Sequence, residues 1–134
     1  DYYAKEFNGE VHYKNNDNHF IRDFPSEKRG ISYAIKICMD DNYSWLKLFS
    51  REEGTATEDN PKSTKKWEQD NKDIETWLEK HELLDGFYFD DGEGRWVREF
   101  EFPKDENALY EFTKKLIKLL EEDVESIYSG KNPK

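Results

Sequence analysis

Two neighbouring segments of the chain alternate between apolar and polar residues. In Gly30–Met39, every second residue from Ile31 to Ile37 is large and apolar, and most residues between them are small or polar. Tyr43–Ser50 alternates in the same way. A period of two is typical of half-buried strands. Because only the turn-forming stretch Asp40-Asp41-Asn42 separates the two segments, they are predicted to form a hairpin.

A second pair of alternating segments follows later in the chain. Phe87–Asp90 and Arg95–Phe102 flank the stretch Asp91-Gly92-Glu93-Gly94, which has the composition of a turn. Pro103 is expected to end the second strand, because proline cannot donate a backbone hydrogen bond. This pattern predicts a second hairpin.

Two segments have the spacing of amphipathic helices. Lys66–His81 places its apolar residues near one helical face, and Asp70 or Asn71 is an alternative N-cap that would shorten this helix. A longer helix is predicted for Asp105–Ser129, with the Asp105 carboxylate as N-cap and Gly130 at the C-cap position. The apolar stripe of the longer helix consists of Leu109, Phe112, Leu116, Leu119, Leu120, Val124 and Ile127.

The remaining segments have weaker patterns. The turn signal Asn8-Gly9 predicts a hairpin of Tyr3–Phe7 with Glu10–Tyr13, and His19–Phe24 is a candidate strand ended by Pro25. Arg51–Lys65 is predicted to be a mobile loop. The predicted fold is α+β in one domain of residues 1–134. After the weak N-terminal region the order is β-β-α-β-β-α, with an antiparallel sheet of two hairpins and two helices packed on one face.

The composition contains features typical of disordered chains and one feature typical of folded domains. The 134 residues are 34% hydrophobic and 39% charged, with a formal net charge of -10, and these values lean toward disorder. Aromatic residues make up 16% of the chain, and each can bury roughly 150–250 Å². We therefore expect a compact aromatic core under a charged surface. The acidic balance disfavours direct binding to nucleic acids or anionic membranes.

Nucleophilic and metal-binding residues are sparse. The single cysteine, Cys38, excludes an internal disulfide and a multi-cysteine zinc site. Its position in the middle of a predicted strand favours a buried, unreactive thiol. His12, His19 and His81 have no helical i, i+4 ligand spacing. No cofactor or metal is therefore expected.

Carboxylates gather in the two predicted hairpin turns. Asp40 and Asp41 lie in the first turn, and Asp90, Asp91 and Glu93 lie in or beside the second. Neither turn fits a calcium-binding loop, so solvated turn residues are the favoured interpretation. A metal-dependent enzyme stays an alternative if both turns meet at one edge of the sheet.

The aromatic strand Tyr43–Phe49 has three interpretations. Packing in the core is favoured, because one face of this hairpin must be covered. An exposed Trp45 would suit a protein partner, since tryptophan and tyrosine dominate binding hot spots. Single-stranded nucleic acid could also stack there, although Lys36 and Lys47 are the only basic residues expected nearby.

One further motif concerns nuclease chemistry. Asp70-Asn71-Lys72 has the letters of a PD-(D/E)XK nuclease motif but lies in a helical pattern rather than on a strand. Phe20–Ile35 (FIRDFPSEKRGISYAI) and the Trp96-centred strand that precedes the last helix resemble a small α+β domain of unknown function. That domain is often appended to PD-(D/E)XK-type nuclease domains in bacterial defence loci. The long loop Arg51–Lys65 and the missing N-terminal helix depart from its pattern, and the resemblance carries no catalytic residues.

Together these observations predict a non-enzymatic, acidic protein-binding module in the cytoplasm. The resemblance implies an accessory domain, or an inhibitor or immunity-type protein, in bacterial defence or phage conflict. The expected partner is a protein with a basic surface, such as a nuclease or another nucleic-acid-binding protein. The candidate partner-binding residues are Trp45, Asp40, Asp41, Asp90, Asp91 and Glu93. Because the chain begins with Asp1 and not with Met, we also expect a processed product or a piece of a longer polypeptide.

Overall fold

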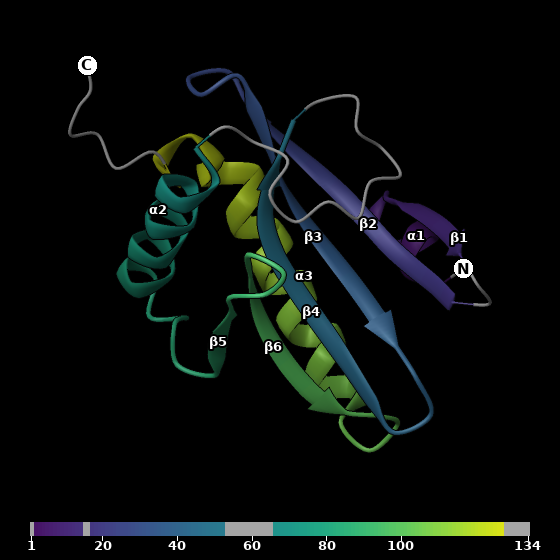
Figure 1. Ribbon diagram of the computed structural model, residues 1–134. Helices are drawn as coiled ribbons and strands as arrows, with labels where there is room; N and C mark the ends of the chain where they lie inside the picture. The colour runs from purple at the N-terminus through teal and green to yellow at the C-terminus, as the bar shows by residue number, and fades with distance from the viewer. Residues whose placement is uncertain (1, 15–16, 53–65, 128–134) are drawn as a thin grey trace.

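In the described part of the chain, six antiparallel strands form one sheet in the order β1-β2-β3-β4-β6-β5 (Figure 1). Figure 1 is a computed structural model, which describes residues 2–14, 17–52 and 66–127. The strands are β1 (Glu10–Lys14), β2 (Asp17–Ser26), β3 (Ile31–Met39), β4 (Tyr43–Arg51), β5 (Phe87–Asp90) and β6 (Arg95–Glu101). The helical elements are α1 (Tyr2–Phe7), α2 (Trp67–Lys80), α3 (Glu106–Asp123) and the 3₁₀ segment η1 (Val124–Ile127). The α+β class and the antiparallel sheet confirm the prediction.

Both predicted hairpins are present, and one strand pair joins them. β3 pairs with β4, and β5 pairs with β6. β4 then pairs with β6, with Tyr43 opposite Glu101 and Leu48 opposite Trp96. Arg51 was predicted to open the loop, but it is the last residue of β4 and lies opposite Ser32. The rest of the predicted loop, from residue 53 onward, lies outside the described residues.

The helices α2 and α3 cover one face of the sheet (Figure 1). Alternate residues of the central strands point to this side, and Tyr33, Ile35 and Leu48 are completely buried there. The helices contribute apolar residues to the same core, namely Ile74, Trp77, Leu78, Leu109, Leu116, Ile117 and Leu120. Burying one such side chain stabilises a fold by about 1.5–3 kcal/mol. The predicted aromatic and aliphatic stripes therefore meet in one core.

The N-terminal segment differs from its prediction. Tyr2–Phe7 is the short helix α1 and not a strand, so the chain does have an N-terminal helix. The contacts of Phe7 account for where α1 lies, because the Phe7 ring is buried against Phe20 and Tyr110. β1 pairs instead with β2. β2 continues through Pro25 because β1 pairs only as far as Ile21, so that β2 is an edge strand where the proline occurs.

The helix ends also differ in detail from the prediction. Asp105 occupies the N-cap position of α3, but its φ of -102° and ψ of 29° lie outside the usual cap region and its side chain makes no cap hydrogen bond. Asp70 and Asn71 lie inside α2 rather than capping it. The predicted end of the last helix at Ser129 and its Gly130 cap lie outside the described residues. Within the described ranges, no helix is long and apolar enough to cross a membrane.

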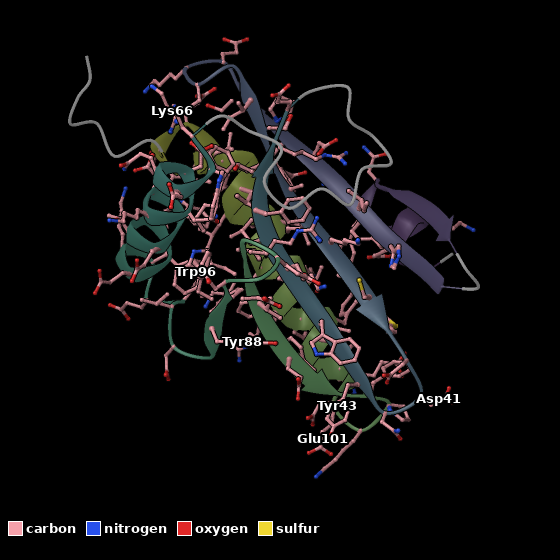
Figure 2. All side chains as sticks on the ribbon, viewed as in Figure 1. Asp41, Tyr43, Lys66, Tyr88, Trp96 and Glu101 are labelled. Carbon is pink, nitrogen blue, oxygen red and sulfur yellow. The ribbon has the colours of Figure 1, made fainter. Side chains whose placement is uncertain are left out.

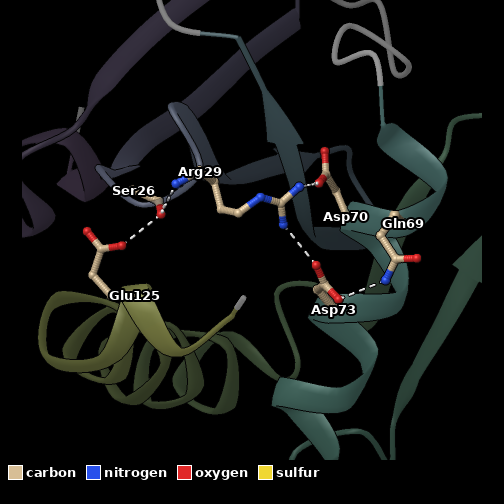
Figure 3. Close-up of polar contacts among 6 residues, drawn as sticks. All are labelled: Ser26, Arg29, Gln69, Asp70, Asp73 and Glu125. Carbon is tan, nitrogen blue, oxygen red and sulfur yellow. Dashed lines mark hydrogen bonds and ion pairs between the residues drawn. The ribbon is translucent and has the colours of Figure 1, made fainter. Parts of the chain in front are cut away.

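A buried ion network fixes the first half of α2 against the turn between β2 and β3 (Figure 3). Arg29, from this turn, donates to the carboxylates of Asp70 and Asp73. Both aspartates are almost completely buried, at 1% and 3% exposure. Gln69 donates a further hydrogen bond to Asp73. The network sets how α2 lies against the sheet.

Candidate partner-binding surface

The two carboxylate-bearing turns lie at opposite ends of the β4–β6 pair. The first turn precedes Tyr43, which lies opposite Glu101, whereas the second turn precedes Arg95, next to the Trp96–Leu48 pair. Tyr43 and Leu48 are five residue steps apart along β4, which is roughly 17 Å at about 3.3 Å per residue. The sheet therefore does not bring the carboxylates together, and the predicted condition for a shared metal or catalytic site is not met. Among the described residues, no group of three His, Cys, Asp or Glu side chains could hold a metal ion.

Most of the predicted turn acids have local structural roles. Asp40 accepts hydrogen bonds from the backbone N–H groups of Asn42 and Tyr43, at 2.8 and 2.7 Å. Asp90 accepts one from the N–H group of Glu93 at 3.1 Å. Glu93 in turn forms an ion pair with Lys47 at 2.8 Å. These contacts stabilise the turns and give Asp40, Asp90 and Glu93 structural roles.

The exposed aromatic residues lie on the face of the sheet opposite α2 and α3 (Figure 2). Tyr43 and Tyr88 are the large hydrophobic residues that remain exposed in the described chain, at 41% and 46%. Trp45 is half-buried, and its ring centre lies 6.1 Å from that of Tyr43. Its indole N–H donates to Glu99 at 3.0 Å. These side chains form an aromatic–acidic patch, defined here as Tyr43, Trp45, Tyr88, Glu99 and Glu101.

Only part of this patch was predicted from the sequence. Trp45 was a candidate, but the prediction of core packing for its strand holds for Leu46 and Leu48 rather than for Tyr43. Tyr88, Glu99 and Glu101 were missed, because the pairing of β4 with β6 decides which residues become neighbours. The available signal was alternation, which places Tyr88 on the opposite face of β5 from Phe87 and Phe89.

The patch is electrostatically negative. Burial raises the pKa of the Tyr88 hydroxyl, and the nearby carboxylates of Glu99, Asp90 and Glu93 raise it further. The hydroxyl therefore stays protonated near neutral pH and can donate a hydrogen bond. Glu99 and Glu101 are both exposed. Such a surface attracts cations and repels phosphate groups.

Basic residues occur on the same sheet face, but those described there are buried or already have partners. Arg51 donates to Asp23 through two nitrogen atoms, at 2.8 and 2.6 Å. Lys47 pairs with Glu93, and Lys36 is buried. The Arg95 guanidinium lies 4.1 Å from the ring centre of Phe49. These contacts reduce the positive surface on which nucleic-acid stacking would depend.

The cysteine and histidine residues form no described reactive site. Cys38 is half-buried and lies opposite His19 in the β2–β3 register. Burial raises the pKa of the Cys38 thiol, whereas a nucleophilic cysteine needs a lowered one. His81 contacts Asp123 at the end of α2, and the side chain of His12 lies outside the described residues. The nuclease-like letters at residues 70–72 lie within α2 and not on a strand.

Comparison with family models, curated proteins and solved structures finds no match to this chain. The resemblance to defence-associated domains therefore stays a prediction from the sequence. The function must be argued from the chemistry of the surface.

Proposed function

We propose that this chain is a non-enzymatic binding module whose aromatic–acidic patch engages a basic surface on a partner protein. The observation that carries the proposal is the exposure of Tyr43 and Tyr88, at 41% and 46%, on either side of Trp45. Large aromatic residues left exposed together are typical of binding sites, where they supply much of the affinity.

The chemistry of the patch favours lysine and arginine on the partner. Aromatic faces attract cations, with a contribution of about 0.5–1 kcal/mol at exposed sites. Glu99 and Glu101 add carboxylates on the same face. The net charge of -10 acts at longer range and would accelerate association with a basic partner.

The biological setting of the proposal rests on the sequence resemblance. An acidic module in a bacterial defence or phage-conflict system would act as an accessory domain, or as an inhibitor or immunity-type protein in the cytoplasm. Its partner would then be a nuclease or another nucleic-acid-binding protein, because such proteins present basic surfaces. The negative patch would occupy the surface that nucleic acid otherwise contacts.

A titration with a model basic peptide tests the proposal. The ¹⁵N-labelled chain is titrated with a peptide of alternating lysine, arginine and glycine, and separately with single-stranded DNA. We expect resonance shifts at Tyr43, Trp45 and Tyr88 with the peptide only. The affinity should fall as salt rises from about 50 to about 500 mM, because exposed charge pairs are screened.

A matched pair of variants separates the patch from general acidity. Glu99→Gln/Glu101→Gln and Glu106→Gln/Glu111→Gln remove the same charge from the patch and from α3, respectively. The patch variant should weaken peptide binding by about 3- to 10-fold, and the α3 variant should change it little. Equal weakening by both variants, salt-independent affinity, or a preference for the DNA would contradict the proposal.

A further inference from the structure

A pocket of about 320 Å³ opens between the N-terminal half of α2 and the β5–β6 hairpin. It lies on the helix side of the sheet, because Phe89 and Trp96 are paired and share the face of the core residue Leu48. Tyr88, the neighbour of Phe89, belongs to the opposite face and to the aromatic–acidic patch. The volume is near the lower end for ligand sites, which suits a small molecule or a single side chain.

Three aromatic side chains line this pocket. Trp67 is the first residue of α2, and Phe89 and Trp96 come from the two strands of the hairpin. The ring centres of Phe89 and Trp96 lie 5.2 Å apart with their planes inclined at 54°. Aromatic rings gathered around one cavity provide surroundings that attract an organic cation.

Charged side chains around the pocket favour the same kind of ligand. Glu68, Glu75 and Asp91 contribute three carboxylates, whereas Lys72 contributes one positive charge. The formal charge of this lining is therefore -2. A cation in the pocket would be attracted by the carboxylates as well as by the rings.

Asn71 joins the two walls of the pocket. Its side-chain Nδ2 donates to the Gly94 carbonyl oxygen, and its backbone carbonyl oxygen accepts from the Trp96 indole, both at 3.0 Å. These two bonds fasten the hairpin to α2 and hold the pocket walls in place. The remaining atom, Oδ1, is buried and inaccessible, so a ligand in the pocket does not reach it. The acceptors within reach are the exposed carboxylates of the lining, to which a protonated amine can donate a charge-assisted hydrogen bond.

We propose that this pocket binds a small protonated amine, with its ammonium group against the aromatic rings and an N–H group directed to one of the lining carboxylates. The proposal rests on a different face of the sheet from the aromatic–acidic patch. Either site can therefore function without the other.

Three probes of similar shape test the chemistry. N,N-dimethylethanolamine is a cation with one N–H group, choline is a cation without one, and 3,3-dimethyl-1-butanol is the neutral analogue. Binding is followed through the indole N–H resonances, since Trp67 and Trp96 line the pocket whereas Trp45 belongs to the patch. We expect dimethylethanolamine to shift the Trp67 and Trp96 signals, choline to bind several-fold more weakly, and the alcohol to bind not at all.

Several results of this titration would overturn the proposal. They are equal binding of the neutral alcohol, equal binding of choline, shifts at Trp45 alone, or no shift up to about 10 mM of the amine, a concentration that would reveal even millimolar affinity. A fourth probe, Nα-acetyl-lysine amide, identifies the source of the amine. If it binds in the same pocket, a peptide side chain is supported as the ligand. If it does not bind whereas dimethylethanolamine does, a free amine is supported.

Matched variants place the site and separate it from the proposed function. Phe89→Leu and Asp91→Asn should each weaken amine binding by about 3- to 10-fold. Tyr88→Leu and Asp41→Asn make the same changes outside the pocket and should leave amine binding unchanged. Asp91 is exposed, so its variant tests the site even if Phe89→Leu fails to fold. Equal effects of the pocket and control variants would overturn the proposal, whereas loss of peptide binding alone would contradict only the proposed function.

Discussion

Asp123 shows how one residue can reverse an expectation based on its position. It lies at the end of α3, where the helix dipole disfavours negative charge. Three donors surround its carboxylate: the Trp77 indole at 2.9 Å, the His81 ring at 2.8 Å and the Ser126 hydroxyl at 2.7 Å. Burial acts to raise the pKa of the Asp123 carboxyl, but these hydrogen bonds lower it to about 2. The carboxylate therefore joins the end of α2 to the end of α3.

Neutralising Asp123 should destabilise the fold in a pH-dependent way. The pKa is lower in the folded chain than the ordinary value of 3.8, so the stabilisation is complete above about pH 4 and disappears as the pH falls toward 2. We expect Asp123→Asn to lower the free energy of unfolding at pH 7 by about 1–2 kcal/mol. Urea denaturation at several pH values measures this difference.

Glu122→Gln is the matched control, because Glu122 is an exposed neighbour on the same helix end. It should change neither the free energy of unfolding at pH 7 nor the loss of stability between about pH 4 and pH 2. A difference between Asp123→Asn and the parent that persists undiminished at pH 2 would contradict the proposed role of the charge.

At the scale of elements, the turn between β2 and β3 is the junction to which two helical elements attach. Arg29 of this turn reaches Asp70 and Asp73 of α2 (Figure 3). From the other side, the Glu125 carboxylate of η1 accepts hydrogen bonds from the Ser26 hydroxyl and from the backbone N–H group of Glu27, at 2.8 and 2.9 Å. Four charged side chains, distant in sequence, thus position the helices on the sheet.

Removing the arginine should be far more harmful than removing a surface charge. Arg29→Met removes the guanidinium that contacts two almost completely buried carboxylates, and such a change typically costs about 3–5 kcal/mol. The free energy of unfolding from chemical denaturation measures the effect. The triple variant Arg29→Met/Asp70→Asn/Asp73→Asn should recover part of the loss, because it also removes the buried charges.

Lys28→Met provides the control for this prediction. Lys28 is the exposed neighbour of Arg29, and its backbone contact with Glu125 does not involve the side chain. Its replacement should change the stability by less than about 0.5 kcal/mol. A comparable loss in the two single variants would show that the ion network is not what stabilises the junction.

At the scale of the whole molecule, the two sheet faces have different chemistry. One face is apolar and covered by α2 and α3, whereas the other bears ion pairs, such as Arg51 with Asp23, and the aromatic–acidic patch. The acidic residues therefore have two different roles. Some acids hold elements together inside the fold, and others, such as Glu99 and Glu101, give the outer face its charge.

The strand order predicts a gradient of protection across the sheet. β3 and β4 have a hydrogen-bonded neighbour on both sides, whereas, within the described part of the chain, the four-residue β5 has one only on its β6 side. Hydrogen exchange followed by NMR should find the amides of Ile35 and Leu48 at least about 100-fold slower than those of Tyr88 and Phe89. Comparable protection in β5 would mean that the edge strand opens only when the whole sheet unfolds.

The sequence predicted those parts of the fold that repeat with a clear period. The alternation in residues 30–50 and 87–102 and the helical spacing of the apolar stripes reflect burial on one side, which local pattern records directly. The six residues of α1 are too few to show a period, and their helix depends on the distant contacts of Phe7 with Phe20 and Tyr110. Tertiary contacts therefore determine the conformation of this segment, and the local sequence pattern does not reveal such contacts.

The candidate sites were less predictable for the same reason. Asp70 and Asn71 appear as polar helix residues, and only the arrival of Arg29 and the β5–β6 hairpin explains their burial. The patch likewise depends on the register between β4 and β6, which alternation within each strand does not specify. The sequence pattern predicted which face of each element is buried. The packing between elements determines which residues come together in a candidate site.

The pairing of β4 with β6 also has a kinetic consequence. The two hairpins are local in sequence, but joining them requires Tyr43 and Glu101 to meet across more than fifty intervening residues. Closing so long a loop loses chain entropy before any contact repays it, and this slows folding. We therefore expect the hairpins to form early and the β4–β6 seam to form in the rate-limiting step, which places the completed aromatic–acidic patch among the last features of the molecule to appear.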